Sequence, residues 1–357
     1  MTVAAINRRW IFARPLEGKL TEAHFERREE PVPALRQGQA LVRVRLVSID
    51  PANRLYLAMQ AYRPQVVPGD VMAGFGIGEI VASTDPRFRA GDLWHGDFGW
   101  QDFSVINSYD RQEYWHRCSE GHAPAELLGV LGITGMTAWF GVEEAIRPQV
   151  GETAVVAGAT GACGSIIAQL LKLRGCRVIG IGGGAEKCRW LVDELGLDAA
   201  IDYRATGPAT GPATGMEAAL AAACPDGVQI YSDAVGGDVS RAVLPLMRRG
   251  ARWYHYGNLT AYDEVRPGAP AARHDAFMSD ALQVHCRTEG LRPRFLLVFD
   301  HYCRRQEAER QLAALLGDGR LKAFSTQLDG FDALPGALVG GGPSGRTGKL
   351  NVALDII

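Results

Sequence analysis

The sequence lacks the cysteine pairs, long apolar runs and charge excess that mark several protein classes. Its seven cysteines are scattered over 357 residues and no two form a C-x-x-C pair, which argues against a disulfide framework or a zinc knuckle. No apolar run approaches the roughly 20 residues of a transmembrane helix. The net charge of −2 leaves no basic excess for nucleic acid or an acidic membrane surface. We therefore expect the protein to bind neither nucleic acid nor a membrane.

Residues 1–14 interleave charges with Trp10, Ile11 and Phe12, so they predict a first strand and not a signal peptide. A cytoplasmic location follows as an expectation. The densest set of metal-binding residue types is His116, Cys118 and His122. Structural zinc takes four ligands, and no fourth has an obvious spacing here. We expect no metal.

The length suggests two domains, and the residue patterns divide accordingly. Residues 41–47 read LVRVRLV, with the period-two alternation of a half-buried strand. Further β patterns follow at 71–82, 91–94 and 101–106, so the first 125 residues predict a small barrel or sandwich.

From about residue 127 strands and helices alternate. Strands are predicted at 154–157, 177–181, 199–202, 229–233 and 252–256, and helices at 165–174, 185–195, 215–223 and 239–249. This alternation predicts a doubly wound α/β domain with a parallel sheet. A last helix at 306–317 precedes a β-like tail after 348, which we expect to pack on the first domain.

A glycine-rich turn in this second part carries the strongest functional signal. Residues 153–165 read TAVVAGATGACGS, a buried strand, then glycines at three-residue spacing, then a helix. Such a turn brings the backbone close to a pyrophosphate, and the helix directs its N–H groups at the anion. A dinucleotide is therefore predicted to bind here.

The next strand points to the kind of dinucleotide. NAD sites place an acid near the end of the second strand, whereas here that strand ends in Gly182, Gly183 and Gly184. The cations Lys187 and Arg189 follow in the next helix. A neutral turn backed by cations suits a 2′-phosphate, so NADP(H) is the expected cofactor.

Residues 205–215 repeat a tetrapeptide, ATGPATGPATG. Gly-Pro every four residues continues neither a helix nor a central strand. We interpret the repeat as a neutral surface loop.

Several motifs in order resemble a known family. They read GITGMTAWFG at 132–141, GACGS at 161–165, GGAEKC at 183–188 and AIDY at 200–203. The N-terminal SIDPANR at 48–54, GWQ at 99–101 and the closing GKL at 348–350 extend the match. Together they resemble the zinc-independent medium-chain dehydrogenases/reductases, within the leukotriene/prostaglandin and curcumin reductase group of NADPH-dependent alkenal/enone reductases.

The resemblance implies a GroES-like β-rich catalytic domain, residues 1–126 completed by 310–357, and a Rossmann NADP-binding domain, residues 127–309. It implies that Thr160, Gly161, Ala162, Cys163 and Gly164 lie under the pyrophosphate. Gly183, Lys187 and Tyr203 would surround the 2′-phosphate. The remaining implied cofactor residues are Thr137, Ala234, Tyr256, Gly257, Leu259, Leu297, Val298, Phe299 and Arg346. Asn53, Tyr56 and Tyr262 would contact the substrate.

The implied reaction reduces the C=C bond of an α,β-unsaturated carbonyl compound by hydride transfer to the β-carbon. The protein then has to position two carbons and supply a donor to the carbonyl oxygen. Tyr262 matches the family's tyrosine in this region and is the predicted catalytic donor, alone or with a ribose hydroxyl of the cofactor.

Three residues depart from the family pattern. Ala52 replaces an aromatic residue, with Tyr56 and Tyr62 the nearest substitutes, and Ala234 replaces an asparagine that contacts the cofactor. Arg346 replaces a further asparagine near the nicotinamide. These changes predict a reshaped pocket or an acidic substrate.

Two alternatives stay open at this point. One is a dedicated biosynthetic reductase of an unusual C=C, C=N or quinone acceptor, and the other is an NADPH-binding protein without turnover. The resemblance also suggests a homodimer, in which strands near residues 295–299 pair across a two-fold axis.

Overall fold

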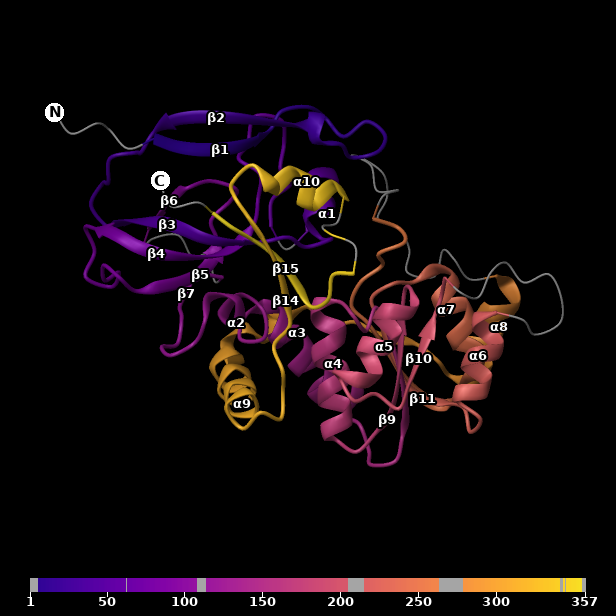
Figure 1. Ribbon diagram of the computed structural model, residues 1–357. Coiled ribbons are helices and arrows are strands. Elements are labelled where there is room, and N and C mark those ends of the chain that lie inside the picture. Colours follow the sequence, from indigo (N-terminus) through magenta and orange to yellow (C-terminus); the bar gives the residue numbers. More distant parts are fainter. Residues whose placement is uncertain are drawn as a thin grey trace.

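The computed structural model describes residues 6–61, 63–107, 114–204, 215–262, 279–340, 343 and 345–354. Two β-sheet regions lie side by side, the N-terminal one in indigo and the later one in pink and orange (Figure 1). In the part of the chain just given, no helix combines the length and apolar character that crossing a membrane requires.

The first region holds a seven-stranded sheet in the order β14-β15-β3-β4-β5-β7, with β6 paired to β3. Its strands are β3 (Gln39–Ser48), β4 (Phe75–Ser83), β5 (Leu93–Asp97), β6 (Phe103–Asn107), β7 (His116–Arg117), β14 (Ser325–Asp329) and β15 (Lys349–Ala353). A separate antiparallel pair consists of β1 (Ile6–Phe12) and β2 (Phe25–Pro31). Strand β3 buries every second residue as far as Leu46, as its alternating pattern predicts, and its last two residues are buried as well.

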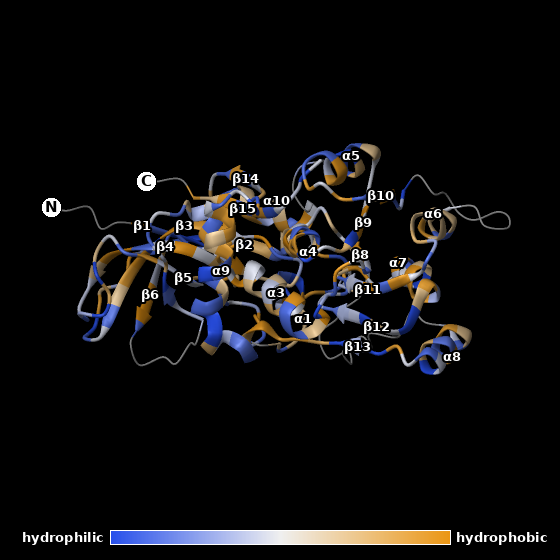
Figure 2. Ribbon diagram, turned by 90° about the horizontal axis from the view of Figure 1, so that it is seen from below, coloured by the Kyte–Doolittle hydropathy of each residue, from blue (hydrophilic) through white to orange (hydrophobic). Residues whose placement is uncertain are grey.

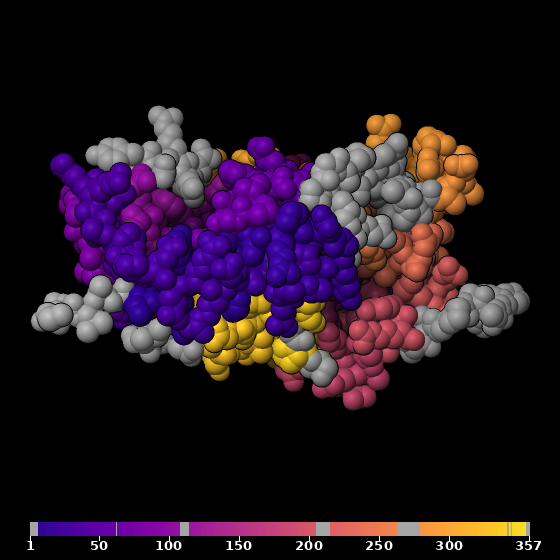
Figure 3. Space-filling view, turned by 90° about the horizontal axis from the view of Figure 1, so that it is seen from above, coloured from indigo at the N-terminus to yellow at the C-terminus, as the bar shows by residue number. Residues whose placement is uncertain are grey.

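The C-terminal tail belongs to this first region, as predicted. Strand β15 pairs antiparallel with β3 and parallel with β14. In the space-filling view the yellow tail lies between the indigo N-terminal part and the pink residues of the second region (Figure 3).

The second region holds a six-stranded parallel sheet in the order β10-β9-β8-β11-β12-β13. Its strands are β8 (Thr153–Ala157), β9 (Arg177–Gly182), β10 (Ala199–Asp202), β11 (Val228–Asp233), β12 (Met247–His255) and β13 (Pro293–Arg294). All five residues of β8 are buried, which fits its central place with both faces covered. The predicted α/β fold class is therefore confirmed.

Ten α-helices lie within the described ranges. They are α1 (Asn53–Ala58), α2 (Pro124–Leu128), α3 (Ile133–Phe140), α4 (Ala162–Leu173), α5 (Ala185–Asp193), α6 (Met216–Ala223), α7 (Gly237–Val243), α8 (Asp280–Glu289), α9 (Arg305–Gly317) and α10 (Ala333–Gly340). Helix α8 buries Leu282 and Cys286, four residues apart. Figure 2 shows polar and apolar residues on this same helix.

The helix predicted at 239–249 is wrong in its second half. Helix α7 ends at Val243, a 3₁₀ turn follows at Leu244–Leu246, and β12 already begins at Met247. Pro245 explains the early end, because proline lacks the N–H that an α-helix needs in its interior.

The domain limits at 126/127 and 309/310 remain our proposal.

The tail crosses the glycine turn at Gly348. The Gly348 N–H donates to the Thr160 carbonyl at 2.8 Å, and Gly348 forms a parallel bridge with Gly161. A Cβ at position 348 would lie 2.0 Å from the Phe324 carbonyl oxygen, and the Gly348 φ is +70°. Only glycine fits this crossing without displacing backbone.

Replacing Gly348 by alanine should therefore lower the free energy of unfolding by about 2 kcal/mol or more, from overpacking and a left-handed φ. Gly317→Ala is the matched control, since nothing lies within 4 Å of its Cβ position and alanine favours a helix. Urea unfolding of both variants measures the difference. Equal stability of the two variants would contradict this reading of the crossing.

Candidate active site

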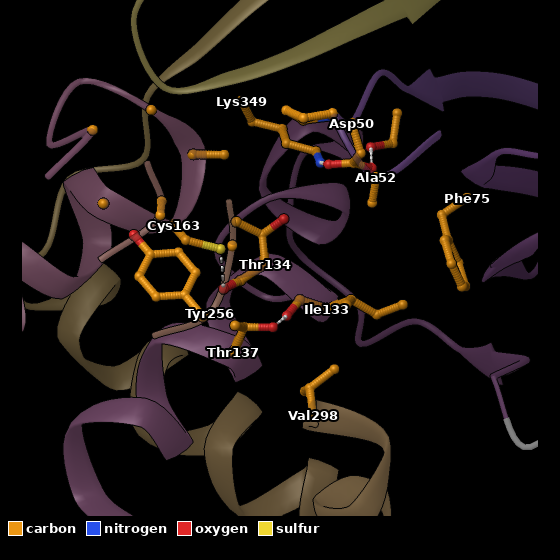
Figure 4. Close-up of a pocket in the computed structure, with 18 of the residues that line it drawn as sticks. Asp50, Ala52, Phe75, Ile133, Thr134, Thr137, Cys163, Tyr256, Val298 and Lys349 are labelled. Carbon is orange, nitrogen blue, oxygen red and sulfur yellow. Dashed lines mark hydrogen bonds and ion pairs between the residues drawn. The ribbon is translucent and has the colours of Figure 1, made fainter. Parts of the chain in front are cut away.

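A cavity of 300 Å³ lies between the glycine turn and the N-terminal sheet (Figure 4). Phe75 of β4 lies across it from Tyr256 and Cys163. The predicted site residues that line it are Thr137, Gly161, Ala162, Cys163, Gly164, Ala234, Tyr256, Gly257, Leu259, Tyr262, Leu297, Val298 and Phe299. The fold thus brings together residues from five separate parts of the sequence.

The glycine turn leaves the start of α4 open to an anion. Gly158 has a φ of +66°, and a Cβ on Gly164 would lie 2.3 Å from the Gly158 carbonyl oxygen, so both positions require glycine. Gly161 precedes the helix, and no side chain caps it. The first N–H groups of α4 are therefore available to a phosphate group.

A second hollow, of 530 Å³, lies at the turn after β9 and is mainly cationic. Three cations, Lys187, Arg204 and Arg346, line it, with one carboxylate, that of Glu186, and with Gly183 and Gly184. Burial, then the charges of Arg346 and Arg204, lower the pKa of Lys187. Bringing cations together in this way costs free energy that a bound dianion such as a phosphate offsets. We name this hollow the cationic cleft.

Tyr203 stands at the edge of the cationic cleft. A Cβ on Gly183 would lie 2.9 Å from the Tyr203 hydroxyl, and Arg204 Nε donates to that hydroxyl at 3.4 Å. Arg204 was missed in the sequence, although its position directly after Tyr203 was a usable signal. Arg189 is exposed and does not line the cleft.

Arg346 was predicted beside the nicotinamide, which would place it in the apolar cavity. It lies instead in the cationic cleft. The reason is the crossing at Gly348. Residues before the crossing reach the Lys187 side of the glycine turn, whereas Lys349 directly after it lines the cavity.

Lys349 and Asp50 form an ion pair in the cavity wall, in which Lys349 is buried and Asp50 is partly exposed (Figure 4). The Lys349 side chain is 5% exposed, and the Ser48 hydroxyl donates to the second carboxylate oxygen of Asp50. Because a buried charge needs a partner, the wall carries two charges that neutralise each other. Both residues stand in family-like motifs, but no local pattern indicates that they meet.

The Asp233 carboxylate anchors the loop on the opposite side of the cavity. It accepts hydrogen bonds from the Val235 and Gly236 backbone at 2.9 Å, the Ser240 hydroxyl at 2.7 Å and the Trp253 indole at 3.2 Å, with His255 Nδ1 at 3.1 Å. Burial opposes ionisation, but these bonds outweigh it and the pKa of Asp233 is lowered.

This anchored loop carries the segment with Tyr262. The Leu259 N–H donates to the Ala234 carbonyl and the Thr260 N–H to the Val235 carbonyl, both at 3.1 Å. Burial raises the pKa of the Tyr262 phenol, so the phenol keeps its proton at neutral pH and can donate a hydrogen bond. Burial likewise raises the pKa of the nearby Cys163 thiol to about 12.

Two of the predicted substrate contacts lie behind the cavity wall. Asn53 is buried, accepts from the Asp50 N–H at 2.7 Å and donates to the Ala73 carbonyl at 3.0 Å. Tyr56 is 2% exposed and packs against the Arg63 guanidinium. Neither lines the cavity, so their predicted contact with substrate gains no support. Tyr62 and residues 205–214 lie outside the described residues.

The structure also places the two predicted threonines and three cavity residues that were not predicted. Thr160 is buried and holds the crossing through its carbonyl, and the Thr137 hydroxyl donates to the Ile133 carbonyl at 2.8 Å. His95, Phe75 and Thr134 line the cavity but were missed, because their neighbours form ordinary β or helical patterns.

No group of three metal-binding side chains occurs among the residues whose structure is described. His116 Nδ1 lies 2.7 Å from the Tyr302 hydroxyl, and His122 lies beside Glu126.

Two family models match the chain. One describes the N-terminal domain of oxidoreductases and matches residues 8–113. The other is described as a zinc-binding dehydrogenase and matches residues 162–280. The second match covers the glycine turn's helix and the strands that flank the cationic cleft.

Similar proteins extend the match over nearly the whole chain. The NADPH-dependent curcumin reductase of Escherichia coli (strain K12) is 34% identical, covering 94% of this chain and 93% of its own length. Prostaglandin reductase 1 of Bos taurus is 27% identical, with 93% and 94% covered. A solved structure of CurA from Vibrio vulnificus in complex with NADPH has a TM-score of 0.85 at 30% identity, with 98% and 100% covered.

The fold, with its two sheets, agrees with these similarities to known proteins. The open glycine turn and the cationic cleft agree with them as well. The chain belongs to the zinc-independent medium-chain dehydrogenases/reductases, in the group of the NADPH-dependent curcumin and prostaglandin reductases.

Proposed function

We propose that this chain, with NADPH bound, reduces the C=C bond of an α,β-unsaturated carbonyl compound. The observation that carries the proposal is the shared cavity. The open start of α4 and the protonated phenol of Tyr262 face one chamber, whose other described walls are mainly apolar. The related reductases of curcumin and prostaglandins agree with this class of substrate.

The residues fit the cofactor at both ends. The open α4 terminus suits the pyrophosphate, and Lys187, Arg204 and Arg346 suit the 2′-phosphate. Bound NADPH supplies the hydride for the β-carbon of the substrate.

The protein's part in the reaction is positioning and charge stabilisation. Tyr262 donates to the substrate carbonyl oxygen as negative charge grows there. The apolar walls exclude water, which strengthens that hydrogen bond. Because Asp50 and Lys349 neutralise each other, the described lining favours a neutral substrate over an acidic one.

The alternative of a dedicated reductase for an unusual acceptor keeps one supporting observation. Ala52 and Ala234, two departures from the family pattern, both line the cavity and leave space where larger side chains would stand.

A cytoplasmic location also stays a prediction from the sequence.

The decisive experiment mixes the purified protein with NADPH and a panel of enals, enones, imines and quinones, and follows the absorbance of reduced nicotinamide. We expect turnover of simple enones. Turnover confined to one complex acceptor would favour the dedicated reductase, and tight NADPH binding without any turnover would favour the non-catalytic protein.

Tyr262→Phe should lower kcat for an enone by about 100-fold while leaving the dissociation constant for NADPH within a factor of about two, because the phenol donates to substrate. Some activity should remain if a ribose hydroxyl shares the role. Steady-state kinetics and fluorescence titration measure both quantities. Wild-type kcat in a folded variant would remove Tyr262 from the mechanism.

Lys187→Ala and Arg346→Ala should each raise KM for NADPH by about 10- to 100-fold, the scale of one lost charged hydrogen bond. KM for NADH should change little, because NADH has no 2′-phosphate. Arg189→Ala removes a cation from the exposed face of the same helix and is the control. If all three variants behave alike, the cationic cleft does not hold the 2′-phosphate.

We also propose that the chain forms a homodimer through the edge of the six-stranded sheet. The strands predicted near residues 295–299 are wrong, because residues 295–297 form no strand and Val298–Arg304 is a 3₁₀ helix. Among the described residues the sheet ends at β13, and Phe295 and Leu297 beside it are 58% and 44% exposed. A sheet edge with exposed apolar residues beside it is suited to a two-fold contact.

Size exclusion with light scattering should give about twice the 38.6 kDa of one chain. Phe295→Glu should shift the mass toward one chain, whereas Val150→Glu, at an 86% exposed loop residue, should not. A wild-type monomer at micromolar concentration would end the dimer proposal.

A further inference from the structure

Asp50 is the more exposed partner of the ion pair in the cavity wall. Its side chain is 31% exposed, whereas that of Lys349 is 5% exposed. Both residues line the cavity, and Figure 4 shows the Lys349 nitrogen meeting the Asp50 carboxylate. A ligand in the cavity can therefore reach the carboxylate, while the ammonium group stays buried.

Contacts from three residues hold this carboxylate in one orientation. Lys349 Nζ pairs with Oδ1, and the Ser48 hydroxyl donates to Oδ2. The Asp50 N–H donates to the Asn53 side chain at 2.7 Å, which fixes the backbone behind the carboxylate. A carboxylate has about four acceptor positions, so one donor on each oxygen leaves capacity for a further donor. The Asp50 side chain is thus an oriented acceptor that is not saturated.

The chemistry of the pair selects the group that Asp50 binds. A carboxylate only accepts hydrogen bonds, so its ligand has to donate one. Since Lys349 already neutralises the charge of Asp50, a neutral donor fits better than a second cation. A hydroxyl group meets both conditions, and carboxylates bind ribose hydroxyls in this way at dinucleotide sites.

The position of the pair points to the hydroxyl groups of the cofactor. Gly348, directly before Lys349, donates to the Thr160 carbonyl at 2.8 Å and bridges to Gly161. The pair therefore lies beside the turn at which the pyrophosphate is expected. In NADPH the nicotinamide ribose follows the pyrophosphate, so its hydroxyl groups enter the cavity on this side.

Two other side chains of the cavity respond to the charge of Asp50. Burial raises the pKa of the Tyr262 phenol, and the charges of Cys163 and Asp50 add to the rise. Burial also raises the pKa of the Cys163 thiol to about 12, with Lys349 opposing the rise and Asp50 adding to it. Because interactions between charges weaken with distance, Asp50 lies at the same end of the cavity as the proposed hydrogen-bond donor of the reaction.

We propose that the Asp50 carboxylate, held by Lys349 and Ser48, accepts a hydrogen bond from a hydroxyl group of the nicotinamide ribose. The inference rests on the proposed NADPH-dependent reduction and adds a positioning residue to it. A hydride reaches the β-carbon only from a correctly placed ring, and a misplacement of about 1 Å costs roughly 100-fold in rate. A hydroxyl group on the substrate is the competing source of the same chemistry.

Two fragments of the cofactor test the contact without turnover. 2′-Phospho-ADP-ribose carries the second ribose but no nicotinamide, and adenosine 2′,5′-diphosphate lacks that ribose. In calorimetry the wild type should bind the ribose-bearing fragment at least about tenfold more tightly. Equal affinity for the two fragments would overturn the inference before any variant is made.

The variants remove the acceptor without leaving a buried charge. Asp50→Leu alone would strand the Lys349 ammonium group, so it is combined with Lys349→Met. The dissociation constant of 2′-phospho-ADP-ribose should rise about tenfold in this double variant, and that of adenosine 2′,5′-diphosphate should stay within a factor of about two. Lys349→Met alone keeps the acceptor and is the matched control. Asp50→Asn with Lys349→Met, whose amide oxygen still accepts, should restore part of the affinity.

Kinetics with an enone that has no hydroxyl group, such as 4-phenylbut-3-en-2-one, separate positioning from substrate binding. In the Asp50→Leu/Lys349→Met variant kcat should fall about 10- to 100-fold relative to Lys349→Met. KM for the enone should change little, because the lost contact is to the cofactor. A pair that only supports the fold would lower the affinity for both fragments alike.

The outcomes are distinct. Equal binding of 2′-phospho-ADP-ribose by Lys349→Met and the double variant would overturn the ribose contact, even if enones are reduced. A loss confined to hydroxyl-bearing enones would assign the hydroxyl to the substrate and also reject the inference. Selective loss of the ribose-bearing fragment, with no enone reduced by the wild type, would retain the contact and reject the proposed reaction. Thermal unfolding of each variant checks that it folds.

Discussion

The crossing of the C-terminal tail over the glycine turn is the contact on which the site depends. At Gly348 the backbone of one region meets the backbone of the other, with a hydrogen bond to Thr160 at 2.8 Å. No side chain fits at position 348, because its Cβ would lie 2.0 Å from the Phe324 carbonyl oxygen. The crossing therefore fixes which residues reach the cationic cleft and which reach the cavity.

Charge is distributed by the same geometry. Arg346, before the crossing, joins Lys187 and Arg204, whereas Lys349, after it, pairs with Asp50. One side thus holds cations that repel one another, which favours a phosphate, and the other holds a neutralised pair within apolar walls. Arg346 and Lys349 are three positions apart, yet one adds to the positive charge of the cationic cleft and the other is neutralised in the cavity wall.

The opposite wall depends on one buried carboxylate. Asp233 ends strand β11, and its carboxylate holds the loop that follows. That loop in turn binds the segment before Tyr262 through backbone hydrogen bonds. The partners of the carboxylate are Val235, Gly236, Ser240, Trp253 and His255. A buried, ionised group with this many donors is rigid, since moving it would leave a charge unpaired. The candidate catalytic phenol is thereby held on a backbone that has little freedom.

The sequence by itself determined the elements and the nucleotide turn, because alternation, helix periodicity and glycine spacing are local properties. It also pointed to Lys187, which lines the cationic cleft, because the signal lay within a few residues of the second strand. Only the tertiary structure decided that Arg346 joins Lys187, that Lys349 meets Asp50, that Asn53 and Tyr56 do not line the cavity, and that His95 does. These facts depend on which strands pair across long stretches of chain, and no local pattern encodes that pairing.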